Sequence, residues 1–250
     1  MDLNKSYKYV DTHCHLDLYK DYRQVISESD RSNTLIIAVT NLPSIFEQEC
    51  ALFQEYSNVI VSLGLHPQLV GSHSNQINLM LKLIPKVQFI GEVGLDYQDN
   101  KEELEVKQRQ IFKQILDKAA EYKNKIISVH SRNSADDVVS MIGANFPGNI
   151  VLHWYSGSIQ TLEKALNNGY YFSINPSMVK TKKGQEIIKR IPIERLLTET
   201  DGPFVKVNGN EVSPLDIEII INEISSIHKI DPQETKRKVE ANFLRINSIK

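Results

Sequence analysis

The segment His13-Cys14-His15 contains the residues in this sequence that are best suited to binding a metal ion. The two imidazoles are two residues apart, so on a β-strand they point to the same side and can grip one cation together. Cys14 would point the opposite way, which favours a packing role over ligation. Imidazole and carboxylate ligands without a thiolate suit Zn²⁺ or Mn²⁺, with Mg²⁺ an option where carboxylates dominate.

Other histidines and carboxylates end short apolar runs elsewhere in the chain. Five of the seven histidines fall at the end of such a run, together with a glutamate and an aspartate. These candidate residues are His13, His15, His66, Glu92, His130, His153 and Asp201. One histidine in such a place is more often a packing residue than a ligand. A buried cluster of imidazoles and carboxylates costs stability unless its members are paired or bind metal, so the whole set favours a metal site.

The apolar runs read as the strands of one parallel sheet, because segments with helical periodicity alternate with them. We expect strands at Tyr9–His13, Thr34–Val39, Val59–Leu65, Val87–Glu92, Lys125–His130, Asn149–His153, Tyr170–Ile174 and Arg195–Thr198. Near-continuous apolar runs suit strands that are buried on both faces. In a (β/α)₈ barrel the reactive residues lie at the C-terminal ends of the strands, which is where the candidate ligands fall.

A strand followed by a helix, eight times in 250 residues, predicts an α/β fold: a single (β/α)₈ TIM barrel with an extra C-terminal helix. We expect one domain over residues 1–250. Asn133 with Asp136 can cap the helix after the fifth strand, and Ser213-Pro214-Leu215-Asp216 starts a later one. Asp231-Pro232 opens the final helix, which we expect to end near Asn247.

The overall composition points to no particular partner. The net charge is −2 and the pI is about 6.4, so a polyanion would have to be held by a local patch or a metal. Met1–Lys8 has no apolar h-region, and no apolar run approaches the roughly 20 residues that span a bilayer. Cys14 and Cys50 show no disulfide spacing. We expect a reduced, cytoplasmic protein with no membrane partner.

Several motifs, in the same order over most of the chain, resemble those of the TatD-related metal-dependent DNases, a family of amidohydrolase-type barrels. They are Asp11-Thr12-His13-Cys14-His15-Leu16-Asp17, Gly64-Leu65-His66-Pro67, Gly91-Glu92-Val93-Gly94-Leu95-Asp96-Tyr97, Val129-His130-Ser131-Arg132 and Leu197-Thr198-Glu199-Thr200-Asp201-Gly202-Pro203. The first motif alone would indicate only the wider barrel group. The third and fifth motifs, in this order, make the resemblance specific to the family.

The resemblance implies two divalent metal ions, Mg²⁺, Mn²⁺ or Zn²⁺, with a third cation as an option during turnover. The ions would be held by His13, His15 and Asp201 on one side and by His130 and His153 on the other, with Glu92 as the bridge. Paired cations lower the pKa of bound water and stabilise the attacking and leaving oxygens of phosphoryl transfer. Asp201 is the candidate general base. Glu199 would hold a ligand in place through hydrogen bonds or act as an additional ligand.

The residues expected to contact substrate each have an alternative explanation. His66 would contact a substrate phosphate or a nearby cation. Arg132 suits bidentate phosphate contact, or equally a salt bridge with Asp136 or Asp137. Lys182 belongs to a lysine-rich loop after the seventh strand that can guide a polyanion, although a solvated loop is the commoner explanation.

Aromatic residues follow two of the strands. Tyr97 and Trp154, with Tyr155, can stack on nucleobases or can serve as packing lids. The sequence departs from the family pattern in these same regions: Trp154-Tyr155 replaces the usual Cys-Phe, and Gln98-Asp99-Asn100 lacks the usual aromatic and basic residues. The segment 204–212 is shorter and less basic than its family counterpart. A divergent TatD-like branch, of the kind found in Qat-type anti-phage systems, is resembled by the combination of His153-Trp154-Tyr155-Ser156-Gly157, Ser173-Ile174-Asn175-Pro176-Ser177-Met178 and Thr200-Asp201-Gly202-Pro203-Phe204.

We therefore interpret the chain as a metal-dependent deoxyribonuclease with DNA as substrate, acting in anti-phage defence. The first alternative is a metal-dependent hydrolase of a small-molecule amide, ester or phosphoester, because the same barrel and metal set serve such reactions. The second is a partner-binding subunit of a defence complex. The full set of predicted ligands argues against an inactive protein but leaves room for a protein partner.

Overall fold

The computed structural model describes residues 7–99 and 101–248. Residues 1–6, on which part of the expectation for the N-terminus rests, and Asn100 lie outside the described residues. The chain contains two compact units, each assembled from separate segments. The first comprises Met1–Ala38, Glu49–Val61 and Phe172–Arg245, and the second comprises Val39–Gln48, Ser62–Tyr171 and Ile246–Lys250. The two units are described in turn.

The first unit is built on parallel strands whose residues are buried on both faces. β1 (Tyr9–Cys14) pairs with β2 (Thr34–Val39), and β3 (Val59–Ser62) follows in the same sheet. β7 (Tyr171–Ile174) pairs with β8 (Leu196–Thr198), and β8 contacts β1. Every residue of β1 and of β2 is buried, as expected for strands covered on two sides.

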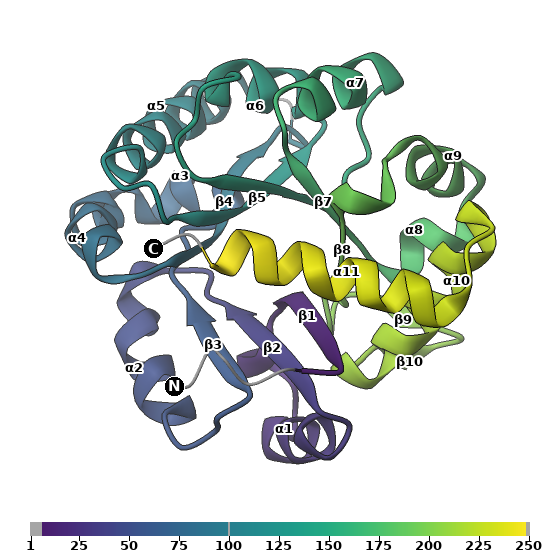
Figure 1. Ribbon diagram of the computed structural model, residues 1–250. Helices are drawn as coiled ribbons and strands as arrows, with labels where there is room; N and C mark the ends of the chain where they lie inside the picture. The colour runs from purple at the N-terminus through teal and green to yellow at the C-terminus, as the bar shows by residue number, and fades with distance from the viewer. Residues whose placement is uncertain (1–6, 100, 249–250) are drawn as a thin grey trace. The chain divides into compact units, whose positions relative to one another are not determined.

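The helices of the first unit pack around these strands. They are η1 (Leu16–Leu18), α1 (Tyr22–Arg31), α8 (Pro176–Lys180), α9 (Lys182–Arg190), η5 (Ile193–Arg195), η6 (Pro214–Asp216), α10 (Ile217–His228) and α11 (Pro232–Asn247). In Figure 1 the label of α10 lies next to those of α8 and α9, and α10 contacts both helices. The helix start predicted at Ser213 is confirmed, because Ser213 and Asp216 form a reciprocal capping box at η6, directly before α10. A short hairpin of β9 (Lys206–Val207) and β10 (Asn210–Glu211) lies between β8 and η6.

One element of the first unit differs from its prediction. The lysine-rich segment expected to be a loop forms α8 and the start of α9. The side chain of Asn175 accepts a hydrogen bond from the Met178 N–H at 3.0 Å, and Thr181 accepts one from the Gly184 N–H at 3.1 Å. These two N-caps start the helices, so Lys182 is an exposed residue in the first turn of α9.

The second unit is built on β4 (Phe89–Asp96), β5 (Ile126–Arg132) and β6 (Asn149–His153), which pair in parallel. Its helical elements are η2 (Pro67–Leu69), α3 (Val70–His73), η3 (Ser74–Gln76), α4 (Ile77–Leu83), η4 (Ile84–Lys86), α5 (Glu102–Ala119), α6 (Ala135–Ile142) and α7 (Ile159–Asn167). The chain passes between the two units at several points, and one of these points, after Gln48, falls inside α2 (Pro43–Phe53). β4 continues past its predicted end at Glu92, with a register shift between Ile90 and Val93.

The cap of α6 also differs from its prediction. Ser134, rather than Asn133, occupies the N-cap position, and no side chain caps the helix there. The Ser134 hydroxyl instead donates to the Leu95 carbonyl at 2.8 Å and ties the start of α6 to β4. None of the helices in the described part of the chain is long and apolar enough to cross a membrane.

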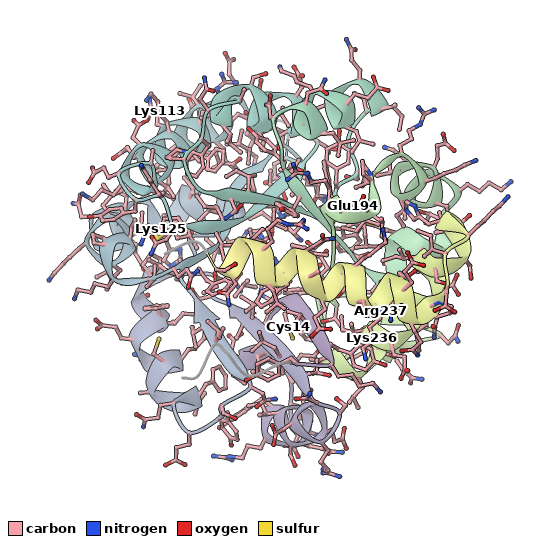
Figure 2. The ribbon with its side chains drawn as sticks, viewed as in Figure 1. Cys14, Lys113, Lys125, Glu194, Lys236 and Arg237 are labelled. Atoms are coloured by element: carbon pink, nitrogen blue, oxygen red, sulfur yellow. The ribbon has the colours of Figure 1, made fainter. Side chains whose placement is uncertain are left out.

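Charged side chains of the second unit occupy two contrasting environments (Figure 2). Lys113 lies on the surface of α5, where its ammonium group pairs with Asp117 one turn later. Lys125 precedes β5 and is buried, with its ammonium group donating to the Val87 carbonyl and lying 4.6 Å from the ring centroid of Tyr122. Burial lowers the pKa of Lys125.

Candidate metal-binding clusters

The first candidate cluster, which we call the His13 cluster, consists of His13, His15 and Asp201 in the first unit. All three residues are buried, at 5% exposure or less. The backbone brings them together, because the Asp201 N–H donates to the His13 carbonyl and the His15 N–H donates to the Gly202 carbonyl, both at 2.9 Å. The end of β1 and the segment after β8 therefore run side by side.

The spacing of the side chains in the His13 cluster fits one bound cation. Asp201 Oδ1 lies 3.5 Å from His15 Nε2 and 3.8 Å from His13 Nε2. Two ligand atoms that each lie about 2.1 Å from one ion are separated from each other by roughly 3–4 Å. The observed separations fall within this range, and two imidazoles with one carboxylate suit Zn²⁺ or Mn²⁺.

Hydrogen bonds to Asp11 hold the frame of the His13 cluster. The buried Asp11 carboxylate accepts from the Thr200 N–H at 2.9 Å, from the Thr200 hydroxyl at 2.5 Å and from the His13 N–H at 3.2 Å. Burial raises the pKa of Asp11 to about 8, although these donors act in the opposite direction. Thr12 and Thr198 add two further hydrogen bonds between β1 and β8. The cluster therefore sits on a rigid junction.

Glu199 lies next to this junction but has partners of its own. It is fully buried, and its carboxylate accepts hydrogen bonds from the Ser173 hydroxyl and, at 3.1 Å, from the Asn175 amide. It is not part of the His13 cluster. Of the two roles expected from the sequence, the supporting role fits this geometry better than direct ligation.

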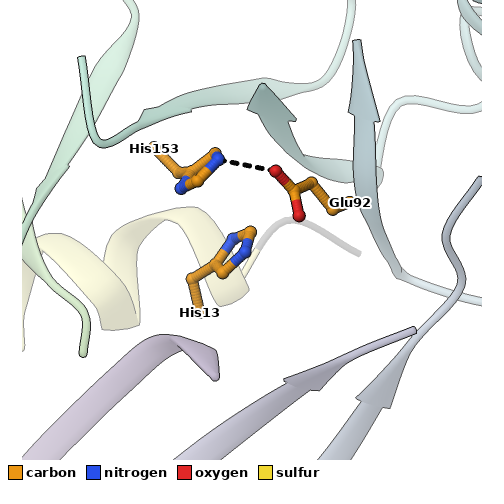
Figure 3. Close-up of side chains that lie close together, drawn as sticks. All are labelled: His13, Glu92 and His153. Carbon is orange, nitrogen blue, oxygen red and sulfur yellow. Dashed lines mark hydrogen bonds and ion pairs between the residues drawn. The ribbon is translucent and has the colours of Figure 1, made fainter. Parts of the chain in front are cut away.

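The second candidate cluster, which we call the Glu92 cluster, is built on β4, β5 and β6 in the second unit, where His153 ends β6 and Glu92 and His130 lie within β4 and β5. It consists of Glu92, His130 and His153, with His66 beside them. The imidazole of His153 faces the carboxylate of Glu92, with Nε2 2.7 Å from Oε1 (Figure 3). His130 Nδ1 lies 2.5 Å from the same oxygen and 3.2 Å from His153 Nε2. The separations of 2.5 and 2.7 Å are hydrogen-bond distances, and the set of two imidazoles and one carboxylate is of the kind that binds a divalent cation.

Each imidazole of the Glu92 cluster presents a defined nitrogen. His130 directs Nδ1 at Glu92, while its Nε2 lies 2.9 Å from Asp96 Oδ2. Burial lowers the pKa of His130, but the charge of Glu92 and the hydrogen bonds with Asp96 and Glu92 outweigh it and raise the pKa overall. Gln68 and the Gln98 N–H also donate to Asp96, each at 2.9 Å.

Asp96 belongs to the motif Gly91–Tyr97, but the sequence motifs alone predicted no role for it. The sequence offered one sign that Asp96 lies near Glu92. In an extended strand the side chains of residues 92, 94 and 96 point to the same side. Ending the predicted strand at Glu92 hid this relationship.

His66 lies beside Glu92, as expected of a residue near the cations. Its Nδ1 accepts from the Gln68 N–H at 3.2 Å, and its Nε2 lies 3.4 Å from Glu92 Oε2. His66, Glu92 and His130 form a second possible ligand group in this unit. His66 is therefore placed to contact a cation or a phosphate group bound there.

The remaining candidates divide by exposure. Arg132 ends β5, two residues beyond His130, and its exposed side chain forms no ion pair within residues 7–99 and 101–248. Its expected alternative partner, Asp137, instead binds Arg109 and accepts a hydrogen bond from the Tyr97 hydroxyl at 2.8 Å. The hydroxyl of the half-buried Tyr97 is thus held by Asp137. Burial and the hydrogen bond with Asp137 raise its pKa to about 12.

The two aromatic residues after β6 have different environments. Trp154 is 37% exposed and has a positive φ of 39°. Tyr155 is buried, and its hydroxyl donates to the Ser158 carbonyl at 2.7 Å. Stacking on a nucleobase is therefore open to Trp154, whereas Tyr155 is a core residue.

Comparisons with known proteins connect these clusters to a family. The family model described as TatD related DNase matches residues 10–248 of this chain. The chain belongs to the TatD related DNase family. The sequence-based resemblance is thereby confirmed.

Individual TatD-family relatives agree with this assignment. Human deoxyribonuclease TATDN3 is 27% identical over 260 residues, covering 95% of this chain and 93% of that protein. The metal-dependent hydrolase MJ1582 of Methanocaldococcus jannaschii is 27% identical over 243 residues, covering 94% and 95% of the two chains. Membership of this family makes the chain a TatD-family metal-dependent hydrolase.

A solved structure of the family has the same fold. The crystal structure of YjjV, a TatD homologue from Escherichia coli, matches with a TM-score of 0.87 at 21% identity, covering 98% of this chain and 100% of that one. This match confirms the predicted fold class, an α/β fold of the (β/α)₈ barrel type.

Proposed function

We propose that this TatD-family protein is a metal-dependent deoxyribonuclease that hydrolyses phosphodiester bonds of DNA. The observation that carries the proposal is the presence of two clusters of imidazole and carboxylate groups, in which Asp201 Oδ1 lies 3.5 Å from His15 Nε2 and Glu92 Oε2 lies 3.4 Å from His66 Nε2, both at metal-binding separations. His13, His15 and His153 lie at the carboxyl ends of parallel strands, which is the reactive end in barrels of this type. The name of the human relative, a deoxyribonuclease, supports DNA as the substrate.

Each cluster would hold one divalent cation, Mg²⁺, Mn²⁺ or Zn²⁺. Bound cations lower the pKa of water and stabilise charge on the oxygens of a reacting phosphate. The expectations that Glu92 bridges two cations and that a third joins during turnover stay predictions. The metal content of Glu92→Gln tests the bridging role, because loss of a shared ligand lowers the occupancy of two sites and loss of an unshared ligand lowers one.

The side chains have separate tasks in the proposed reaction. The oxygen of a water molecule forms a bond to phosphorus, and the bond from phosphorus to one sugar oxygen breaks. Asp201 takes the proton from the attacking water and releases it to solvent, and the leaving sugar oxygen gains a proton from solvent water. Arg132 and His66 would contact a phosphate group bound near the Glu92 cluster of the second unit, since an exposed guanidinium group and a neighbouring imidazole can both donate to its oxygens.

The decisive experiment compares purified wild-type protein with Glu92→Gln and Asp201→Asn on end-labelled single-stranded and double-stranded DNA. Each protein is incubated with Mg²⁺, Mn²⁺ or EDTA. The matched controls are Asp99→Asn and Glu211→Gln, which remove exposed carboxylates that lie outside both clusters. We expect metal-dependent cleavage by the wild type and both controls, and a loss of at least about 100-fold in the two cluster variants.

The same experiment separates the alternatives. If metal-loaded wild-type protein cleaves no DNA, the nuclease proposal fails, and small-molecule esters, amides and phosphoesters become the substrates to screen. If Glu92→Gln and Asp201→Asn cleave as well as the wild type, the assigned residues are wrong. A role in anti-phage defence, with or without a protein partner, stays a prediction from the sequence and is tested by phage infection of cells that carry the wild type or Asp201→Asn.

A further inference from the structure

Phe204 combines high exposure with a ring contact to a proposed metal ligand. It is 58% exposed, and its ring centroid lies 4.8 Å from that of His15 with an interplanar angle of 77°. Single exposed apolar residues are common on protein surfaces and by themselves indicate nothing. Phe204 differs from a scattered surface residue because its ring is set edge-to-face against the buried imidazole of His15.

The backbone holds Phe204 in this place. The Phe204 and Val205 N–H groups both donate to the Asp201 carbonyl, at 3.1 and 3.2 Å. Val205 and Val212 are buried at 1% exposure, and the Val212 N–H donates to the Val205 carbonyl at 3.1 Å. The hydroxyl of Tyr19 donates to the Val212 carbonyl at 2.5 Å. The ring is thus presented from an anchored turn, which lowers the entropic cost of using it as a contact surface.

Positive charge lies on the elements next to this turn. Lys206 is exposed on β9, and β9 contacts α8, which ends at Lys180. α8 packs against α9, whose first residue is the exposed Lys182. Surfaces that bind single-stranded nucleic acid combine aromatic rings, on which bases stack, with basic residues that neutralise the backbone phosphates. Here Glu211, opposite Lys206 in the hairpin, offsets part of the positive charge.

We propose that Phe204 is the stacking platform for a nucleobase of the nucleotide whose phosphate is bound at the His13 cluster. This inference rests on the proposed nuclease function and adds a subsite that selects substrates with a planar base. The contact with His15 sets the ring directly beside the cluster, so that phosphate and base of one nucleotide are recognised together. Stacking of this kind tolerates any base, because every base has a π-face.

The first test measures binding without cleavage. The fluorescence of 2-aminopurine deoxynucleoside 5′-monophosphate, which contains no phosphodiester bond, is titrated with protein in the presence of Mg²⁺ or Zn²⁺. We expect quenching by the wild type, because stacking on a ring quenches this base. Phe204→Ala should bind about tenfold more weakly, Phe204→Tyr should bind like the wild type, and Ile219→Ala, which removes an equally exposed apolar residue on α10, should change nothing.

The second test measures cleavage of two single-stranded oligonucleotides, one intact and one with an abasic residue beside the cleavage position. We expect Phe204→Ala to raise KM about tenfold on the intact strand and to leave KM unchanged on the abasic strand. Equal binding and equal KM for Phe204→Ala and the wild type would overturn the stacking inference, and so would an absence of quenching by the wild type. If the wild type cleaves no DNA but its nucleotide binding still depends on Phe204, the nuclease proposal fails and the stacking site stands.

Discussion

His130 Nε2 lies 2.9 Å from Asp96 Oδ2, while the Nδ1 atom of the same ring lies 2.5 Å from Glu92 Oε1. One imidazole is therefore held by a carboxylate on each side, and β4 supplies both carboxylates. Histidines that bind metals usually donate their second nitrogen to such a partner, which fixes the ring orientation and raises its basicity. Asp96 is thus placed to position His130, leaving Nδ1 for a cation.

We expect Asp96→Asn to weaken metal binding by the Glu92 cluster about 10- to 100-fold, because the amide orients the ring less firmly and adds no negative charge. Isothermal titration of metal-free protein with Zn²⁺ or Mn²⁺ measures this change. Asp99→Asn is the matched control, since the Asp99 side chain is 61% exposed and lies 3.9 Å from the Lys101 ammonium group. Unchanged metal affinity in Asp96→Asn would show that the contact with His130 is only structural.

Metal binding should also stabilise the fold. A ligand that binds only the folded chain adds about 3 kcal/mol to the free energy of unfolding when its free concentration is about 100 times its Kd. We expect the urea midpoint of the wild type to rise when EDTA is replaced by Zn²⁺ or Mn²⁺. The gain should shrink in Asp201→Asn and persist in Glu211→Gln, which alters an exposed residue of β10. Identical midpoints for the wild type in EDTA and in metal would contradict the assignment of the clusters.

The strands could be predicted from the sequence because burial on both faces produces continuous apolar runs. Thr34–Val39 and Asn149–His153 have the predicted bounds. The alternation of His13 and His15 around Cys14 also predicted their shared side correctly, because the period of an extended strand is two residues.

The extent of β4 could not be predicted, since glycine usually weakens a strand. Gly94 has a φ of 140°, and a Cβ atom there would meet the His130 carbonyl oxygen of the neighbouring strand. The glycine therefore permits a close approach of β5, and the strand continues to Asp96. Whether a glycine ends a strand or allows close packing depends on a neighbour that is remote in the sequence.

The prediction of a loop for the lysine-rich segment after β7 was wrong for a different reason. Its charges predicted a solvated loop, but Asn175 and Thr181 cap two short helices there. Asn175 also donates to Glu199, which is 24 residues away in the chain. Local composition does not reveal that a capping residue is held by a distant carboxylate.

Arg132 and Arg109 should respond to substitution in opposite ways. Arg132 is exposed and has no ion-pair partner in the described chain, whereas Arg109 binds Asp137. If Arg132 contacts phosphate, Arg132→Ala raises KM for DNA about tenfold and changes the free energy of unfolding by less than about 0.5 kcal/mol. Arg109→Ala should leave KM unchanged and lower stability by no more than about 1 kcal/mol, since the pair is partly exposed. Steady-state cleavage and urea unfolding of both variants measure these effects, and an unchanged KM in Arg132→Ala would remove its phosphate role.

Glu49 should make the stability of the protein depend on pH. This residue of α2 is 5% exposed, and neither of its carboxylate oxygens has a hydrogen-bond partner within the described residues. Burial raises the pKa of Glu49 to about 8, the negative charge of Asp17 adds to the shift, and His15 opposes it. The folded chain therefore holds a proton that the unfolded chain releases near pH 4.5. The stabilising contribution of the protonated form is complete below about pH 4.5 and is lost as the pH rises through about 8.

Glu49→Gln imitates the protonated carboxyl and removes this titration. We expect its free energy of unfolding to exceed that of the wild type by an amount that grows by about 1–3 kcal/mol between pH 5 and pH 8. Urea unfolding in EDTA measures the difference for the metal-free protein, where no cation near His15 alters the charge balance. Glu47→Gln changes an exposed carboxylate on the same helix and should follow the wild-type pH profile. A constant difference between Glu49→Gln and the wild type across this range would mean that Glu49 is ionised in the folded protein, with a partner that stabilises its charge.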